Sequence, residues 1–217
     1  MRPYLRSPSE IYAQSFATVR AEARLDRFDP AMEKVVVRLV HACGMVDVAD
    51  RIAFSADAAD HGAAALAAGA PILCDCQMVA AGITQKLLPN ENRICVTLND
   101  ASTPNRAEDL GTTRSAAAVE LWKPEIAGAI VAIGNAPTAL FHLLERLDDG
   151  WPRPALILGF PVGFVGAAES KAELANDPRD TPFIALRGRR GGSAMASAAV
   201  NALAILASEN GRGAPKR

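Results

Sequence analysis

Long hydrophobic runs and a large net charge are both missing from this 217-residue sequence. The apolar stretches at 130–133 and 155–159 are far shorter than the roughly 20 residues that a membrane-spanning helix needs. The first residues lack the continuous apolar stretch of a signal peptide. With 23 basic and 24 acidic residues the net charge is −1, so no overall field attracts nucleic acid or an anionic membrane. We therefore expect a cytoplasmic protein that binds neither nucleic acid nor membranes.

Nucleotide-binding and metal-binding motifs are absent as well. No Gly-x-Gly-x-x-Gly follows the first predicted strand, and no Gly-x-x-x-x-Gly-Lys-Ser/Thr occurs anywhere. Cysteines are few, and Cys43, Cys74, Cys76 and Cys95 lie in apolar stretches, which is typical of reduced thiols in a cytosolic core. Cys74 and Cys76 have no second cysteine pair nearby, so they favour buried packing over a metal site. We therefore expect no bound metal, and standard nucleotide chemistry loses support.

What the sequence does contain is the composition of a packed globular protein. Hydrophobic residues make up 50% and charged residues 22%, which is far from the balance of a disordered chain. The length lies in the range that α/β folds cover as a single domain. We expect one domain over residues 1–209 and a flexible polar tail at 210–217.

Apolar runs and helical patterns alternate along the chain. Ser7, Pro8 and Glu10 form a helix-start signature, and that helix is expected to reach about Arg27. A second helix is predicted from Asp29-Pro30 to Gly44. Strands are then predicted at 52–54, 71–74, 93–98, 129–133, 155–160 and 183–186, and helices at 57–68, 113–122, 137–147, 167–176 and 192–208. This alternation predicts an α/β single domain with a doubly wound, mainly parallel sheet and helices on both faces.

Three glycine-containing loops, at 134–138, 159–163 and 188–193, each follow a predicted strand. In a parallel sheet, ligands bind beyond the carboxyl ends of the strands, where such loops meet the amino termini of helices. We expect the backbone amides of these loops to receive carboxylates or phosphates.

His41 is the best candidate for proton chemistry among the three histidines. It falls in the last turn of the second predicted helix, whose carbonyl end carries partial negative charge and favours an imidazolium. On the pattern alone, a capping or packing role for His41 stays open. His61 and His142 lie within helical patterns and are interpreted as surface or core-edge residues.

Three further polar residues are candidates, each with a plain alternative. Ser15 shares the apolar face of the first helix with Ile11 and Val19, where a hydroxyl bonded to its own helix is the simplest interpretation. Arg114 stands near a helix start, where positive charge opposes the helix dipole, and this favours ligand contact over simple exposure. Lys86 adds local positive charge that could face a ligand, and a solvated lysine without a ligand is the plain alternative.

Several segments form a collinear set over nearly the whole chain. They are Ser15-Phe16 with Val19-Arg20-Ala21-Glu22; His41 before Cys43-Gly44-Met45; Pro71-Ile72-Leu73-Cys74-Asp75 with Met78-Val79; Gly134-Asn135-Ala136-Pro137-Thr138-Ala139-Leu140; Gly159-Phe160-Pro161-Val162-Gly163-Phe164-Val165 with Glu169-Ser170-Lys171; and Gly191-Gly192-Ser193. In these segments the chain resembles the precorrin-8X methylmutases, isomerases of corrin-ring construction in cobalamin (vitamin B12) biosynthesis.

The resemblance implies a reaction in which a methyl group moves between adjacent carbons of the tetrapyrrole, which converts precorrin-8X to hydrogenobyrinic acid without a redox cofactor or metal chemistry. It implies that His41 is the proton donor to a ring nitrogen, or a partner to that nitrogen, and that Ser15 and Arg114 contact the substrate. Lys86 and Asn135 are added as substrate contacts from their positions alone. Protonation fits this chemistry, because draining electron density from the ring lowers the barrier to the methyl shift.

The resemblance also implies a homodimer with sites at or near the subunit interface, and it leaves open a handover of the anionic product to a downstream amidating enzyme. Three other interpretations remain. One is the cobalt-containing version of the reaction, whose enzymes share the histidine. The others are a carrier that binds the tetrapyrrole without catalysis and a generic nucleotide-dependent α/β enzyme.

Overall fold

The structure, a computed structural model, describes residues 2 and 4–213, with side chains up to Asn210. The first helix, α1 (Pro8–Glu22), begins at Ser7, whose hydroxyl accepts a hydrogen bond from the amide of Glu10. It ends short of the predicted Arg27. The Arg27 guanidinium donates instead to the carbonyls of Ala49 and Ile52, at 2.7 and 2.6 Å. The connecting segment is therefore held against a distant part of the chain and leaves the helix.

The second helix, α2 (Pro30–Cys43), has the predicted boundaries. The Asp29 carboxylate accepts hydrogen bonds from the amides of Ala31 and Met32 at its start. Gly44 ends it in the left-handed conformation, with φ of 68°. His41 therefore lies in the last turn, as predicted.

All six predicted strands are confirmed, with ends equal to or slightly inside the predicted ones. They are β1 (Ile52–Phe54), β2 (Ile72–Cys74), β3 (Ile94–Val96), β4 (Ile130–Ile133), β5 (Leu156–Gly159) and β6 (Phe183–Leu186). They form one sheet in the order β1-β6-β5-β4-β2-β3. Every pairing is parallel except that of β1 with β6. The mainly parallel sheet is thus confirmed.

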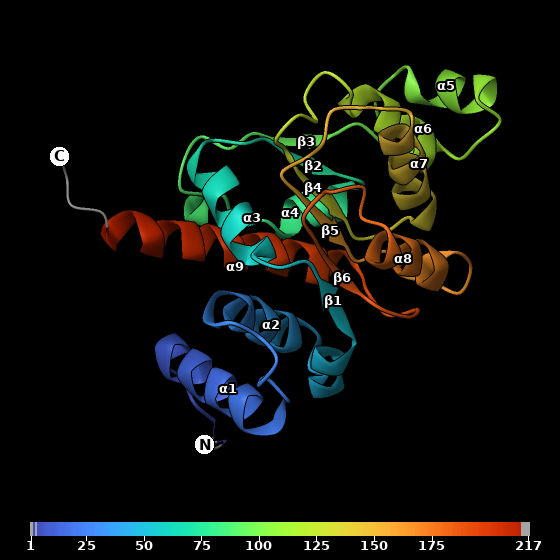
Figure 1. The fold of residues 1–217 in the computed structure, drawn as a ribbon. Helices are drawn as coiled ribbons and strands as arrows, with labels where there is room; N and C mark the ends of the chain where they lie inside the picture. The colour runs from blue at the N-terminus through green and yellow to red at the C-terminus, as the bar shows by residue number, and fades with distance from the viewer. Residues whose placement is uncertain (1, 3, 214–217) are drawn as a thin grey trace.

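Helices cover both faces of the sheet, as Figure 1 shows. One face packs against α2, α3 (Ala58–Ala67), α4 (Gln77–Gly82) and α9 (Ser193–Gly213). The other face packs against α7 (Pro137–Asp148), α8 (Ala167–Asn176) and the short η3 (Glu120–Trp122), which continues α6 (Arg114–Val119). This arrangement confirms the predicted α/β class.

Several short segments were not predicted. They are α4, α5 (Thr103–Asp109), η1 (Val46–Arg51) and η2 (Gln85–Leu87). The last helix is longer than predicted, because α9 continues to Gly213. The expected tail at 210–217 thus begins inside a helix, and 214–217 lie outside the described residues. No helix in the described part of the chain is both long and apolar enough to cross a membrane.

The sheet topology creates a switch point between β2 and β4. From β2 the chain moves outward to β3, and from β4 onward it extends toward the opposite edge. In open parallel sheets this is the position where ligands bind, beyond the carboxyl ends of the two strands. The residues there are Asp75, after β2, and Gly134 to Ala136, after β4.

Candidate active site

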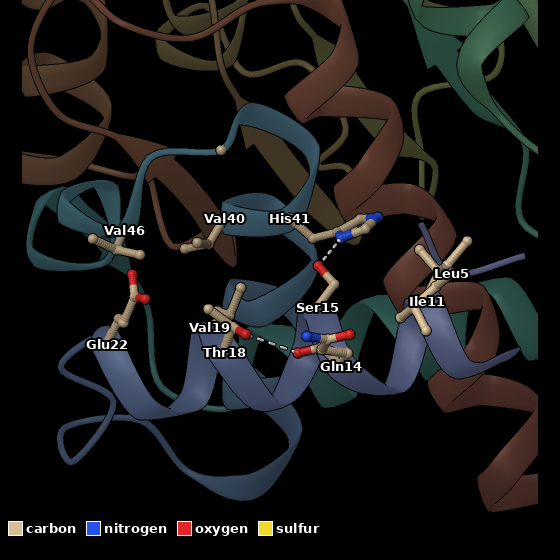
Figure 2. Close-up of a pocket in the computed structure, with 11 residues that line it drawn as sticks. Leu5, Ile11, Gln14, Ser15, Thr18, Val19, Glu22, Val40, His41 and Val46 are labelled. Atoms are coloured by element: carbon tan, nitrogen blue, oxygen red, sulfur yellow. Dashed lines mark hydrogen bonds between the residues drawn. The ribbon is translucent and has the colours of Figure 1, made fainter. Parts of the chain in front are cut away.

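His41 is held by three side chains of α1, which packs against α2. Ser15 Oγ lies 2.8 Å from His41 Nδ1. A dashed line marks this hydrogen bond in Figure 2. The ring centroids of Tyr12 and Phe16 lie 5.5 and 5.3 Å from that of His41. Residues 12, 15 and 16 share one helix face, so α1 presents all three to the imidazole. The simplest interpretation of Ser15, a hydroxyl bonded to its own helix, is therefore wrong.

A groove of about 410 Å³ lies between α1 and α2 beside this pair (Figure 2). Its walls include the apolar side chains of Leu5, Ile11 and Val40. Glu22 is the carboxylate among its lining residues, and no lysine or arginine of the described residues belongs to that lining. The groove suits the apolar part of a ligand and, apart from a protonated His41, offers no positive charge to an anionic one.

The His41 ring has one nitrogen fixed and one open. The Ser15 contact uses Nδ1, and within the described residues Nε2 makes no hydrogen bond. Because a serine hydroxyl both donates and accepts, this contact is compatible with a neutral and with a protonated imidazole. The site can therefore give or take a proton at Nε2 while the ring keeps its orientation.

The other predicted site residues lie apart from this pair. Arg114 opens α6, and its guanidinium donates to the Leu98 carbonyl at 3.3 Å and to Asn99 Oδ1 at 3.2 Å. Asn135 follows β4, and Lys86 is exposed on η2. None of Lys86, Arg114 and Asn135 lines the groove or bonds to Ser15 or His41 in the described structure. One chain thus brings together only Ser15 and His41 of the predicted set.

Comparison with known proteins gives this geometry a context. The model of the precorrin-8X methylmutase family matches residues 10–206. A relative from Pseudomonas aeruginosa named precorrin-8X methylmutase is 61% identical over 204 residues, which cover 94% of this chain and 98% of the relative. The chain belongs to the precorrin-8X methylmutase family. It is accordingly a methyl-migrating isomerase of cobalamin biosynthesis, and the family implies a tetrapyrrole substrate.

More distant methylmutases also match over nearly the whole length. A relative from Priestia megaterium named cobalt-precorrin-8 methylmutase is 36% identical over 207 residues, which cover 95% of this chain and 91% of the relative. A solved structure of a precorrin-8X methylmutase from Thermus thermophilus has a TM-score of 0.83 at 38% identity, covering 93% of this chain and 98% of that one. The fold described above is therefore that of a solved methylmutase.

The switch point of this methylmutase is filled by one of its own side chains. Asp75 is buried, and its Oδ1 accepts a hydrogen bond from the amide of Gly134 at 2.9 Å. Its Oδ2 accepts from the amides of Asn135 and Ala136, at 2.9 and 2.8 Å. Burial raises the pKa of the Asp75 carboxyl, and the hydrogen bonds from the three backbone amides oppose that shift. The expectation that this loop receives a ligand anion is wrong for these three amides, because Asp75 already occupies them.

The loops after β5 and β6 also use backbone amides internally. The amide of Gly163 donates to the Arg189 carbonyl at 3.1 Å, and the amide of Gly192 donates to the Phe160 carbonyl at 2.8 Å. These two amides are likewise occupied by the protein. Charged and polar side chains therefore become the better candidates for contacting a tetrapyrrole's carboxylates.

Sequence reasoning missed Tyr12 as a neighbour of His41 and gave no role to Asp75. The spacing of Tyr12 to Ser15 and Phe16 was a usable signal, since it puts all three on one helix face. The other histidines differ from His41: His61 is exposed on α3, and the buried His142 has its Nε2 2.6 Å from Glu120 Oε1. The four cysteines are free thiols. In the described part of the chain, no three His, Cys, Asp or Glu side chains group as metal ligands would.

Proposed function

We propose that this methylmutase converts metal-free precorrin-8X to hydrogenobyrinic acid, with His41 as the proton donor. The observation that supports this best is the 2.8 Å contact between Ser15 and His41 beside an open groove. The metal-free substrate is favoured by sequence identity, which is 61% to the relative named precorrin-8X methylmutase and 36% to the one named cobalt-precorrin-8 methylmutase.

The proposed reaction begins with proton transfer from His41 Nε2–H to a nitrogen of the bound ring. Protonation withdraws electron density from the conjugated system, which lowers the barrier to migration of the methyl group. One carbon–carbon bond to the methyl group breaks as another forms at the adjacent carbon. Because substrate and product are isomers, the proton returns to Nε2 and neither an oxidant nor a reductant is consumed.

Ser15 fixes the orientation of the His41 imidazole during this cycle. When His41 is protonated, its Nδ1–H donates to Ser15 Oγ, and this contact stabilises the charged ring. Tyr12 and Phe16 limit tilting of the ring from two directions. A fixed donor atom matters, since proton transfer requires hydrogen-bond distance to the accepting nitrogen.

The substrate's carboxylates require cationic or hydrogen-bond-donating side chains, and the described lining of the groove contains no lysine or arginine. We assign Arg114, Lys86 and Asn135 to these contacts. Since none of them reaches the groove within one chain, we propose that the working enzyme is a homodimer in which a second copy contributes part of the site. The anionic product would then pass to an amidating enzyme that consumes its carboxylates.

Two exposed apolar surfaces support the homodimer. Near the groove, Tyr4 and Tyr12 are 65% and 50% exposed. In the loop between β5 and α8, Phe164 and Val165 are 86% and 88% exposed. Contiguous apolar residues that face solvent in a monomer are typical of protein interfaces. A contact that buries Tyr12 would lie beside His41, because the two ring centroids are 5.5 Å apart.

Replacing His41 tests catalysis against simple binding. His41→Ala is expected to retain tetrapyrrole binding, followed as a shift in the visible spectrum, and to lose about 10²-fold or more of the rearrangement rate. His61→Ala, at an exposed position, is the matched control and should keep the native rate. An undiminished rate in His41→Ala would rule out the acid role. Native protein that binds the ring but never converts it would favour the carrier.

The metal content of the substrate is tested by turnover. Native protein is expected to convert metal-free precorrin-8X rapidly and the cobalt-loaded ring slowly, each followed by its absorbance change. Rapid turnover of the cobalt form alone would reverse the assignment in favour of the cobalt-precorrin-8 reaction.

Dimer formation is tested by placing a negative charge in the loop between β5 and α8. Phe164→Glu should shift the protein to a monomer in analytical ultracentrifugation and should lower the conversion rate. Leu110→Glu places the same charge on another exposed apolar residue, 49% exposed at the end of α5, and should leave both properties native. A native enzyme that is active as a monomer contradicts the shared site.

A further inference from the structure

Lys171 is a buried amine that has no carboxylate partner in the described structure. It lies on α8 with 0% of its surface exposed. Its Nζ donates to two backbone carbonyls, those of Pro161 at 2.8 Å and Arg190 at 2.5 Å. Burial lowers its pKa to about 8. Burying a lysine costs free energy unless its amine is satisfied by hydrogen bonds. The two carbonyls that accept from Nζ therefore indicate what Lys171 does.

The two carbonyls belong to different loops, one after β5 and one after β6. These loops already lie close together, since the amide of Gly192 donates to the Phe160 carbonyl at 2.8 Å. A Cβ added at Gly191 would lie 2.3 Å from the Phe160 carbonyl oxygen, so only glycine permits this approach. Lys171 donates to both loops where they meet and so fixes one against the other.

The Arg190 side chain carries this link to the end of α2. Its guanidinium pairs with Asp47 through both carboxylate oxygens, with Nη1 to Oδ1 at 3.0 Å. Nη1 also lies 3.4 Å from Met45 Sδ. Met45 and Asp47 lie one and three residues after Gly44, which ends the helix that carries His41. Arg190 is thus held at its carbonyl by Lys171 and, through its guanidinium, holds the segment after α2.

We infer that Lys171 is a positioning residue for the methyl migration: by holding Arg190 it fixes the segment at the end of α2 and thereby the orientation of His41. This inference rests on the proposed role of His41. Lys171 itself touches only the protein and takes no part in bond making. Loss of Lys171 should affect kcat, because a wrongly oriented His41 Nε2 slows proton transfer without changing how the tetrapyrrole binds.

Lys171→Met removes the amine and keeps a side chain of similar length. We expect kcat to fall about tenfold or more with little change in KM. Arg179→Met is the matched control, because Arg179 also stabilises this region, through Asp148 and Glu173, without reaching Arg190. Both variants should melt at a lower temperature, and only Lys171→Met should lose kcat. Equal kcat losses in the two variants would overturn the inference.

A second set of variants keeps the test decisive if Lys171→Met fails to fold. Arg190→Met leaves the backbone carbonyl that Lys171 binds and removes the pair with Asp47. It should reproduce the kcat loss, and Asp47→Asn should do so in part. Combining Arg190→Met with Asp47→Asn should cost no more than the larger single effect, because both break the same link. Losses in kcat that multiply would contradict the proposed connection.

Ring signals of the histidines give a readout that does not depend on turnover. The nitrogen-15 signals of His41 should shift in Lys171→Met and Arg190→Met and stay native in Arg179→Met, while those of the exposed His61 stay native throughout. Unchanged His41 signals in Arg190→Met overturn the inference even if kcat falls. If His41→Ala remains fully active, the proposed function fails, and these signals still decide whether Lys171 positions the ring.

Discussion

The surroundings of His41 set it apart from the other two histidines. His142 is buried with its Nε2 2.6 Å from a carboxylate oxygen of Glu120, so its ring is engaged within the core. His61 is exposed, and no described side chain bonds to it. His41 combines one engaged nitrogen with one that makes no hydrogen bond in the described structure, and the residue lines an open groove. A proton donor needs both features, because the ring must be oriented and its second nitrogen must reach a ligand.

Removing the Ser15 hydroxyl tests this orientation. Ser15→Ala loses one hydrogen bond to the imidazole, worth about 1 kcal/mol, so kcat should fall about fivefold. KM should change little, since the ring-binding groove keeps its shape. The measurement is steady-state conversion followed by absorbance, with Ser9→Ala, at an exposed position on the first turn of α1, as control. A Ser15→Ala variant with native kcat would assign the hydroxyl to packing alone.

The buried amine of Lys171 makes stability depend on pH in a defined direction. Its pKa of about 8 lies below the ordinary value of 10.5, so between these values the folded protein binds fewer protons than the unfolded chain. Its contribution to stability is therefore complete above 10.5 and is lost as pH falls through about 8. Urea unfolding of the native protein and of Lys171→Met should give stabilities whose difference shifts in favour of the native protein as pH rises across that window. A difference independent of pH would contradict the burial effect.

The location of His41 was predictable from local signals, whereas its partners were not. Asp29-Pro30 and Gly44 define α2 through capping, which puts His41 at the helix end. The Ser15 contact joins residues 26 positions apart, and no local pattern specifies how two helices pack. The bond from Gly134 to Asp75 spans 59 positions. For that reason the loop amides looked available to a ligand when the protein itself occupies them.

At the scale of elements, α2 depends on the glycine that ends it. Gly44 has φ of 68°, and a Cβ added there would have no atom within 4 Å, so Gly44→Ala meets only backbone strain of about 1 kcal/mol. Gly128→Ala is matched to it, with φ of 71° and equally open space before β4. Both variants should lose similar stability in urea unfolding, and only Gly44→Ala should lower kcat. An equal effect of the two on kcat would separate the helix end from catalysis.

The strands were predictable from local sequence, whereas the short helices and the end of α1 were not. The six strands were predicted because each is an apolar run between turn residues, and burial of the parallel strands on both faces keeps these runs continuous. The short helices α4 and α5 escaped prediction, because six or seven residues carry little periodicity and such helices depend on tertiary packing. The end of α1 was misplaced because Arg27 bonds to Ala49 and Ile52, which are distant in sequence.

At the scale of the whole molecule, two buried charges organise the carboxyl edge of the sheet. The Asp75 carboxylate accepts three backbone amides, and the Lys171 ammonium donates to two backbone carbonyls. Neither charge has a buried counter-ion within the described residues, and each is stabilised by peptide dipoles instead. The Val162 amide also donates a hydrogen bond to the Asn135 carbonyl. Together with this bond, the two buried charges connect the loops after β2, β4, β5 and β6. The edge is therefore fixed before a ligand arrives.

This organisation predicts a chemical rescue. Asp75→Ala removes the carboxylate and leaves three amides pointing into a space of carboxylate size, so stability should fall by about 1–3 kcal/mol. Formate carries the same group and should bind there, because successive amides of this kind attract anions. The melting temperature of Asp75→Ala should then rise with formate concentration, as linkage requires, while the native protein gains nothing.

Asp60→Ala serves as the control for this rescue, since Asp60 is exposed on α3 and makes no hydrogen bond through its side chain in the described structure. It should show no dependence on formate, and chloride at equal ionic strength should not replace formate in Asp75→Ala. A formate effect of equal size in both variants would indicate a general salt effect. That result would remove the support for an amide site built around one carboxylate. A specific rescue would show that the protein carries its own anion at the position where related sheet topologies bind a ligand.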